Sequence, residues 1–251
     1  MSPDPELQLR GIVLRSDRAD RRISALTPQG LWHFTHPNPS RKGGARAAVL
    51  ASALNPLCLS HFTFISRERG WGWLRSAQLE AVLWPDLGGG SGKSAEQRQQ
   101  MLDSLKVSSR LRRLTLLSQQ PAADSPLLFQ LLLTCLRRLL SGSPPSAILG
   151  IFGVKLLMHE GRWPAKPACL LCDANLLGRE LLLGSEGFLC LNCQKRGEAP
   201  AGGVQFTQNE TDRLCGIGLR RTWSELAELE IGSLLGEKIA SAAEMIALHA
   251  N

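Results

Sequence analysis

Short runs of alternating apolar and polar residues fill the chain from Leu7 to Gln78, which indicates β-strands with one buried face. The predicted strands are residues 9–14, 22–26, 31–35, 59–66 and 71–77. Thr27-Pro-Gln-Gly30 predicts a tight turn, because Pro and Gly occupy positions that turns favour. A basic, glycine-rich loop at residues 37–46 and an apolar stretch to residue 54 interrupt the series. This pattern predicts a small closed barrel of the OB type.

Beyond residue 77 the pattern changes to the period of helices. Ser94-Ala-Glu-Gln97 is a capping box and predicts a helix that runs to about residue 117. Asp124-Ser-Pro126 and Ser143-Pro-Pro145 each place a cap before a proline at a first helical position. They predict two further helices, the second of which runs through His159. Successive helices of this kind predict a small bundle.

A cysteine-containing segment interrupts the helices. Thr207-Gln-Asn-Glu210 then predicts the cap of another helix, and residues 231–250 read as a last amphipathic helix. The fold class expected is therefore α+β and multidomain. The predicted segments are an OB-fold domain at 1–80, a helical bundle at 81–162, a four-cysteine zinc-binding segment at 163–203, and C-terminal helices that pack on the bundle at 204–251.

The positive charge of the chain lies almost entirely in its first third. The net charge is +7 and the isoelectric point is about 9.3. Residues 1–75 hold eleven Lys and Arg against five Asp and Glu, whereas residues 76–251 hold eighteen against seventeen. This asymmetry favours an anionic partner for the first third. An ordinary solvated surface is the alternative, because an excess of charge is a weak signal by itself.

We expect neither secretion nor membrane insertion. The first residues are acidic and proline-rich, unlike a signal peptide. The most apolar stretches, 126–140 and 148–158, are short and are interrupted by Arg137, Arg138 and Lys155. Seven cysteines is an odd number, and four of them form two tight pairs, which is typical of metal binding in a reducing compartment.

The strongest local signal is the pair of motifs Cys169-Leu-Leu-Cys172 and Cys190-Leu-Asn-Cys193. Two residues between cysteines let both thiolates face one ion, and the connector is long enough for a hairpin that brings the pairs together. Four thiolates leave no open position, so we expect one structural zinc ion. Reduced thiols or two redox pairs are the alternative. The spacings of iron–sulfur sites are usually tighter.

No catalytic set stands out, and we expect the protein not to be an enzyme. Residues 87–94, Leu-Gly-Gly-Gly-Ser-Gly-Lys-Ser, lack the first glycine of a phosphate loop and follow a strand-breaking Trp-Pro-Asp, so a flexible linker explains them better. The five histidines are dispersed, and no metalloprotease or serine hydrolase motif occurs. The unpaired cysteines, Cys58, Cys135 and Cys215, lie in apolar sequence and are expected to be inert.

Basic residues of the predicted barrel are the candidate DNA contacts. They are Arg15, Arg18, Arg21 and Arg22 around the first turn, and Arg41, Lys42 and Arg46 in the loop after the third strand. Aromatic residues nearby in sequence are Trp32, Phe34, Phe62, Trp71 and Trp73. Cations beside exposed rings are what binding of single-stranded nucleic acid requires. Several rings must instead fill the barrel core, so we expect about two at most to be exposed.

At this point the sequence resembles the RecO family of bacterial recombinational repair mediators. The similarity covers most of the chain in order. The matching residues are Gly11-Ile-Val-Leu-Arg15, Leu26-Thr-Pro-Gln-Gly30, Ser40-Arg-Lys-Gly-Gly-Ala-Arg46, Leu54-Asn-Pro56, Leu74-Arg-Ser-Ala77, Phe152-Gly-Val-Lys-Leu-Leu157, Gly161 and Cys169-Leu-Leu-Cys172.

The resemblance implies a non-enzymatic mediator of DNA repair in the RecF pathway, located in the bacterial cytoplasm with the nucleoid. Such a protein anneals complementary strands, binds single- and double-stranded DNA, and with RecR helps load recombinase onto strands coated by single-stranded DNA-binding protein (SSB). The resemblance also implies that Arg41, Lys42 and Arg46 contact DNA. Family members often carry arginines where this chain has Ile148-Leu-Gly-Ile-Phe-Gly153, so a contact with the SSB tail would use Arg137, Arg138 or Lys155.

Two other functions stay open at this point. The first is a zinc-ribbon adaptor that binds proteins while its basic loop is only solvated. The second is a nuclease or other hydrolase, which is disfavoured because no carboxylate cluster accompanies the cysteines in sequence.

Overall fold

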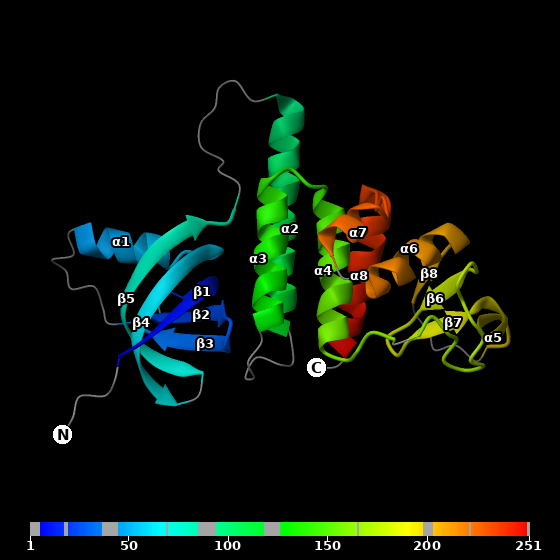
Figure 1. The fold of residues 1–251 in the computed structure, drawn as a ribbon, viewed down its shortest axis with the longest axis horizontal. Helices are drawn as coiled ribbons and strands as arrows, with labels where there is room; N and C mark the ends of the chain where they lie inside the picture. The colour runs from blue at the N-terminus through cyan, green and yellow to red at the C-terminus, as the bar shows by residue number, and fades with distance from the viewer. Residues whose placement is uncertain are drawn as a thin grey trace. The chain divides into compact units, whose positions relative to one another are not determined.

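The computed structural model of the chain forms two compact units (Figure 1). The first unit comprises residues 1–112 and 119–141, and the second comprises residues 113–118 and 142–251. The residues that the structure describes are 6–17, 20–36, 45–68, 70–84, 94–117, 126–164, 166–197, 203–220 and 222–249. The finer division into four segments stays a prediction.

A closed five-stranded barrel forms most of the first unit, as the alternating pattern predicts. Its strands are β1 (Glu6–Asp17), β2 (Arg22–Thr27), β3 (Gly30–Thr35), β4 (Cys58–Glu68) and β5 (Trp71–Val82). They are ordered β1-β2-β3-β5-β4, and β4 also pairs with β1. Neighbours are antiparallel except β3 and β5, whose short parallel pairing closes the barrel. The predicted OB-type barrel is thereby confirmed.

Aromatic rings fill the interior of the barrel. Phe34, Phe62 and Phe64 are fully buried, and the Phe34 ring lies 5.1 Å from that of Phe62 and 5.0 Å from that of Phe64. Gly72 makes room for them, because a Cβ at that position would lie 2.5 Å from the Phe64 ring. Residues that alternate with these core positions point outward, so the strands present a separate outer face.

The predicted turn between β2 and β3 is confirmed, and its hydrogen bonds explain it. Thr27 Oγ1 donates to the Gly30 carbonyl (2.9 Å) and accepts from the Gln29 amide (3.2 Å). Gly30 has a φ of 106°, which favours glycine. The apolar stretch after the basic loop forms a helix that the pattern analysis left unassigned, α1 (Ala45–Ala53). The buried Ser60 hydroxyl donates to the Ala53 carbonyl (2.7 Å), which fastens α1 to β4.

The helices after the barrel begin close to where their caps predict. In α2 (Ala95–Leu117), Ser94 and Gln97 form both bonds of the capping box, with distances of 3.0 and 3.2 Å. Helix α3 (Pro126–Leu140) buries one apolar stripe that includes Leu132 and Leu136, and it lies against β1 and β2. An apolar stripe of this kind is expected of a helix packed on one side only.

Helix α4 (Pro145–His159) corrects the cap predicted at Ser143. The N-cap is Pro144, which makes no side-chain hydrogen bond. A residue before proline is held in extended backbone, and Pro144 has a ψ of 117°, so Pro144 itself takes the non-helical cap position. Pro145 still occupies the first turn, as predicted.

A close helix pair forms the centre of the second unit. Helix α8 (Ser233–His249) packs along α4 (Figure 1). The helices approach at glycines: a Cβ on Gly236 would lie 2.5 Å from the Ser146 carbonyl carbon, and one on Gly150 would lie 2.8 Å from the Gly236 carbonyl oxygen. Small residues therefore let the two backbones touch, and most of α4 is buried.

The remaining elements of the second unit surround the cysteine motifs. A small sheet has the order β7-β6-β8, with β6 (Leu181–Leu183) between β7 (Phe188–Cys190) and β8 (Val204–Phe206). Three helices complete the unit: α5 (Leu191–Lys195), α6 (Gln208–Leu219) and α7 (Trp223–Ala227). The sequence pattern did not predict β6, β7, β8, α5 or α7, because each is at most five residues long.

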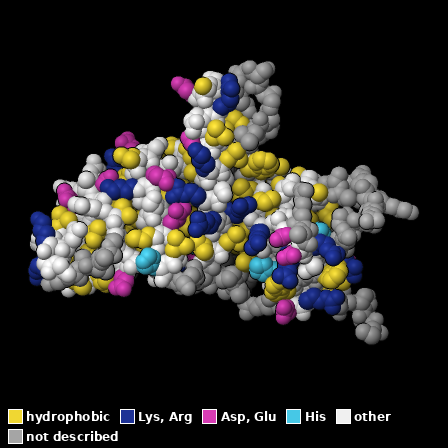
Figure 2. All heavy atoms as spheres, turned by 180° about the vertical axis from the view of Figure 1, so that it is seen from behind, with side chains coloured by type: hydrophobic (Ala, Val, Ile, Leu, Met, Phe, Trp, Pro, Cys, Tyr) yellow, Lys and Arg dark blue, Asp and Glu magenta, His cyan; other side chains and the backbone are white. Residues whose placement is uncertain are grey.

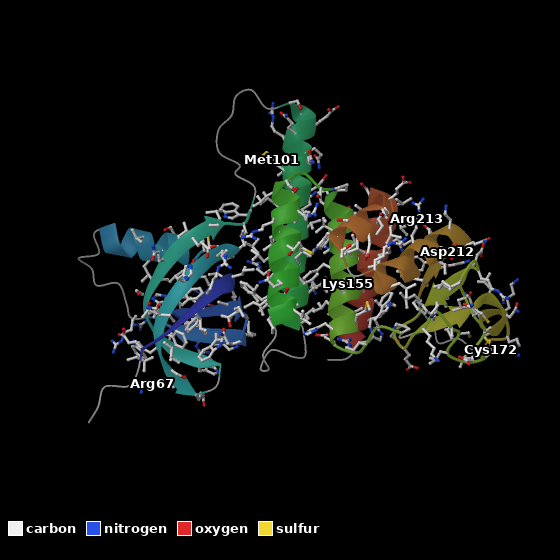
Figure 3. The ribbon with its side chains drawn as sticks, viewed as in Figure 1. Arg67, Met101, Lys155, Cys172, Asp212 and Arg213 are labelled. Atoms are coloured by element: carbon white, nitrogen blue, oxygen red, sulfur yellow. The ribbon has the colours of Figure 1, made fainter. Side chains whose placement is uncertain are left out.

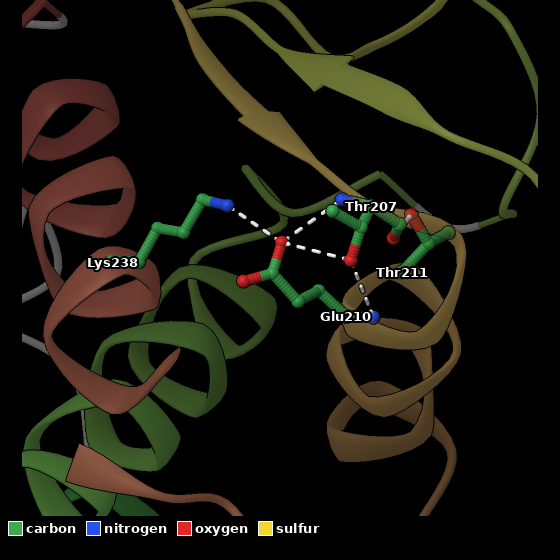
Figure 4. Close-up of polar contacts among 4 residues, drawn as sticks. All are labelled: Thr207, Glu210, Thr211 and Lys238. Atoms are coloured by element: carbon green, nitrogen blue, oxygen red, sulfur yellow. Dashed lines mark hydrogen bonds and ion pairs between the residues drawn. The ribbon is translucent and has the colours of Figure 1, made fainter. Parts of the chain in front are cut away.

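The capping box predicted for α6 is present and is linked to α8. Glu210 accepts from the Thr207 amide (2.9 Å), and the Glu210 amide donates to Thr207 Oγ1 (3.5 Å). Lys238 of α8 also donates to Glu210 (2.6 Å), as Figure 4 shows. One carboxylate therefore caps α6 and holds α8 beside it.

Candidate metal centre and nucleic-acid surface

Cys169 and Cys172 lie in a tight turn that directs both sulfur atoms to one side. The Asp173 amide donates to the Cys169 carbonyl (2.8 Å), and the Cys169 amide donates to the Ala174 carbonyl (2.9 Å). Asp173 has a φ of 56°, a left-handed conformation that aspartate tolerates better than most residues. The turn is thus closed by its own backbone.

The second pair is held by the sheet and a short helix. Cys190 ends β7 and is also the N-cap of α5, where its sulfur accepts from the Cys193 amide (3.4 Å). The Cys190 amide donates to the Cys169 sulfur (3.3 Å), which joins the two pairs. Pairing of β6 with β7 places Cys190 beside Leu181 and so forms the hairpin that the long connector predicted.

The sulfur atoms of Cys169, Cys172, Cys190 and Cys193 all lie within 4.8 Å of one another. The Cys172 and Cys190 sulfurs are 3.7 Å apart, far beyond a disulfide bond. Ligands at a zinc–sulfur distance of about 2.3 Å in a tetrahedron lie about 3.8 Å apart. The cluster therefore has dimensions that fit one tetrahedral metal ion. Cys172 is exposed, and the other three cysteines are buried (Figure 3 labels Cys172).

The thiol pKa values differ within the cluster. Burial opposes ionisation of Cys169, but amide donors, including those of Cys190 and Cys172, lower its pKa to about 6. Burial raises the pKa of Cys193 to about 12, although Arg196 acts in the other direction. The Arg196 guanidinium donates to the Cys193 sulfur (3.2 Å). Four sulfurs this close cannot all ionise without a neutralising charge, and a bound divalent cation supplies one.

Sequence reasoning missed Arg196. It is the third residue after the last cysteine of the cluster. The short helix α5 starts directly after the ligand Cys190 and brings Arg196 back to the Cys193 sulfur. A basic residue one helical turn after the last cysteine is the signal that could have found it. Its donor bond offsets part of the net negative charge that four thiolates and one divalent ion would carry.

The three unpaired cysteines are buried, as predicted for inert thiols. Burial raises the pKa values of Cys58 and Cys135, and burial with a contribution from Asp212 raises that of Cys215 to about 11. Thiols with raised pKa values are poor nucleophiles at neutral pH.

The predicted DNA contacts are only partly described. Arg18, Arg41 and Lys42 lie outside the described residues, and Arg46 belongs to α1, with a side chain outside the described part. Arg46 is thus the second residue of a helix, although the sequence pattern placed it in a loop. Arg15, Arg21 and Arg22 lie at the junction of β1 and β2, where the structure brings them together.

The aromatic residues divide as expected between core and surface. Phe34 and Phe62 are core residues, and Trp32 packs against Phe64 with 4.8 Å between ring centroids. Trp71 is partly exposed, and Trp73 is 39% exposed. Two exposed arginines on β4 and β5, Arg67 and Arg75, were not singled out from the sequence. The alternation of buried and exposed positions along these strands is the signal that could have found them.

The charged surface is mixed outside these positions. On the face drawn in Figure 2, Lys and Arg side chains are scattered with acidic side chains among them.

Lys155 has a structural role, because its ammonium donates to the Arg220 carbonyl and burial lowers its pKa. Residues 148–153 are all buried in α4. No helix among the described residues is long and apolar enough to cross a membrane.

Comparison with known proteins relates part of this chain to a protein family. A family model described as "Recombination protein O C terminal" matches residues 102–225, a span that contains the whole cysteine cluster. Over this span the chain matches the RecO family. Similar to it is the DNA repair protein RecO of Chlamydia pneumoniae, with 29% identity over 174 residues. That alignment covers 68% of this chain and 63% of the length of the Chlamydia protein. The resemblance noted in the sequence is thereby confirmed. The matched span begins within α2, ends within α7 and includes the four cysteines.

Proposed function

We propose that this chain is a DNA-binding mediator of recombinational repair in the RecF pathway. It anneals complementary single strands, and with RecR it helps load recombinase onto strands coated by SSB, in the cytoplasm and without turnover of a substrate. The observation that carries this proposal is the family match over the helices and the four-cysteine cluster. The name of the Chlamydia relative, a DNA repair protein, supports it.

The cysteine cluster holds one structural zinc ion in this proposal. Four sulfur ligands and tetrahedral dimensions fit zinc, and they leave no position for an activated water molecule. Among the described residues the cluster contains cysteines only, which gives a hydrolase no carboxylate base at the metal. The metal would therefore stabilise the small sheet and α5, and would not take part in chemistry.

DNA is contacted through the basic residues of the barrel. They are Arg15, Arg18, Arg21, Arg22, Arg41, Lys42 and Arg46. Long cationic side chains near a strand junction and beside a glycine-rich segment can follow a phosphate backbone without reading its sequence. The same contacts serve single- and double-stranded DNA, because both present phosphates.

The SSB tail is contacted through Arg137 and Arg138 in this proposal. Both are exposed at the end of α3, whereas Lys155 is partly buried within α4. An acidic tail is attracted by cations at the C-terminal end of a helix only when their charge exceeds that of the helix end itself. Two adjacent exposed arginines meet that condition better than one partly buried lysine.

A salt series of filter-binding measurements tests DNA binding against the alternative of a protein adaptor. Affinity for single strands and duplexes should fall steeply as the salt concentration rises, because phosphate contacts release counterions. No binding even at low salt would favour the adaptor.

A further inference from the structure

A row of side chains crosses the outer face of the barrel at the level of Trp73. Arg22 of β2 pairs with Thr35 of β3, Thr35 pairs with Trp73 of β5, and Trp73 pairs with Ile65 of β4. Directly paired residues point to the same face of a sheet. Because Ile23, Phe34, Leu74 and Phe64, which precede or follow these residues, are buried, the row itself faces outward.

A second row runs parallel to the first. Ser24 pairs with His33, and His33 pairs with Trp71. The rings of His33 and Trp71 lie 4.9 Å apart, and Ser24 Oγ bonds His33 Nδ1 (2.9 Å). Burial lowers the pKa of His33, so the imidazole is a neutral support for the Trp71 ring at pH 7. We call the two rows together the tryptophan face.

Two β-bulges place arginines on either side of Trp73. Along the pairing of β4 with β5, Arg67 is the extra residue between Ser66 and Glu68, and Arg75 is the extra residue between Leu74 and Ser76. Bulges redirect the side chain at the extra position and are frequent beside binding sites. Both arginines are exposed, and Figure 3 labels Arg67 near the junction of β4 and β5.

The arginines around the tryptophan face are available for an anion. Among the described residues, no carboxylate forms a salt bridge with Arg22, Arg67 or Arg75. The Arg15 guanidinium lies 3.9 Å from the Asp17 carboxylate. Three carboxylates also lie at the rim of this face. In the strand register Glu6 is opposite Ile65, Asp17 is opposite Arg22, and Glu68 is opposite Trp71. The four arginines thus face three carboxylates, so electrostatic attraction here is modest and the exposed ring must contribute most of the affinity.

We propose that the tryptophan face binds the unpaired bases of a single strand by stacking, with Trp73 as the primary ring and Arg67 and Arg75 on the flanking phosphates. The proposal rests on the DNA binding proposed above and adds to it a discrimination between single strands and duplexes. Bases in a duplex are already stacked and cannot lie on Trp73, whereas phosphates are equally accessible in both forms. The basic residues near Arg41 supply affinity to either form, and Trp73 supplies affinity to unpaired bases only.

Two tryptophans of similar exposure, Trp73 and Trp84, allow a matched test. Trp84 lies beyond the end of β5 and is 38% exposed, almost the same as Trp73, but it belongs to neither row. The Trp73→Leu variant should bind an oligothymidine about tenfold more weakly, since stacking of one base on an aromatic ring is worth this much or more. Duplex affinity and the salt slope should stay unchanged. Trp84→Leu should match the wild type, and a strand of abasic residues should bind both variants and the wild type alike.

The flanking arginines have a separate signature. Arg67→Gln with Arg75→Gln should flatten the salt slope for single strands by about 1.4 units if both touch phosphates. Circular dichroism of each variant confirms that the barrel is folded.

The outcomes separate this proposal from the one on which it rests. If the wild type binds no DNA at low salt, DNA binding itself is wrong. If the wild type binds oligothymidine and Trp73→Leu binds it equally well, stacking at the tryptophan face is overturned while DNA binding stands. An equal loss on single strands and duplexes would also overturn stacking, because it would point to a phosphate contact or a disturbed barrel. Loss of binding to a protein partner without any change on DNA would assign the face to protein recognition instead.

Discussion

The four cysteines differ in exposure although they form one cluster. Cys169, Cys190 and Cys193 are buried among the elements of the second unit, whereas Cys172 is exposed at the turn. Each sulfur nevertheless has the other three as neighbours, so removal of one leaves three ligands and an open position. The spacing of the cysteines was sufficient to predict the cluster. Arg196 was missed, because its contact with Cys193 depends on where α5 ends, and the sequence pattern did not predict α5.

The Cys172→Ser variant should lose most of its metal. Wild-type protein is expected to contain about one zinc per chain, measured by elemental analysis. The second unit should unfold at a lower temperature in the variant, since zinc binding contributes directly to its folding, while the barrel should be unaffected.

Cys215→Ala is the matched control for the metal measurement. Cys215 is a buried cysteine of the same unit outside the cluster, so the zinc content of the Cys215→Ala variant should equal that of the wild type. Full zinc occupancy in a Cys172→Ser, Cys190→Ser double variant would refute the four-cysteine site.

Helix α6 depends on one carboxylate for both its cap and its contact with α8. Burial opposes ionisation of Glu210, but hydrogen bonds from Lys238 and Thr207 lower its pKa below the ordinary value of 4.5. A carboxyl group with a lowered pKa in the folded state contributes stability above its unfolded pKa, and that stability is lost as the pH falls through the folded pKa. The cap motif was predictable from four residues, whereas the link to Lys238 required the tertiary fold.

Glu210→Gln should destabilise the second unit at pH 7 by about 1 kcal/mol, the size of a lost charged cap. The difference from wild type should shrink as the pH falls below 4.5 and through the lowered pKa of Glu210. Urea unfolding at several pH values measures it. Glu180→Gln, at an exposed position, should have no comparable effect, and a Glu210→Gln deficit that persists undiminished at low pH would contradict the assigned role.

The close packing of α4 against α8 depends on the missing side chain of Gly236. An added methyl group there would lie 2.5 Å from the Ser146 carbonyl carbon and 2.6 Å from the Ala147 nitrogen, which is a steric clash, whereas at Gly232 nothing lies within 4 Å. Gly236→Ala should therefore cost about 2 kcal/mol of unfolding free energy, the ordinary cost of overpacking.

Gly232→Ala should change the stability much less, which makes it the control in the same denaturation series. If Gly236→Ala proved as stable as the wild type, the close contact between the two helices would be wrong. The amphipathic pattern predicted that a last helix exists, but not which glycine touches α4, because neighbours across helices are not visible in sequence spacing.

At the scale of the whole molecule, long regular elements were predictable and short or tertiary features were not. Alternation predicted all five barrel strands, since strand period and turn residues are local properties. The bulges at Arg67 and Arg75 were not predictable, because a bulge is defined by the register between two strands. The tryptophan face follows from that register, and for this reason the sequence indicated the rings without showing which of them share a surface.

The basic loop at residues 37–46 is expected to contribute to the affinity of the whole protein for nucleic acid. An Arg41→Ala, Lys42→Ala, Arg46→Ala variant should flatten the salt slope for single strands by about two units if all three side chains touch phosphate. Affinity should fall alike for every sequence, and zinc should stay bound.

A control variant removes as much charge elsewhere: Lys106→Ala, Arg113→Ala and Arg137→Ala, all at exposed helical positions. Its slope should equal that of the wild type. An unchanged slope in the loop variant would show that the loop is only solvated, and contact would then fall to Arg15, Arg21 and Arg22.

Annealing of complementary oligonucleotides tests the central claim most directly. Zinc-loaded protein should accelerate duplex formation over the spontaneous rate, and it should do so both on bare strands and on strands coated by SSB. The loop variant should be slower on both. Binding of single strands without any acceleration of annealing, with or without SSB, would contradict the assignment as a recombination mediator.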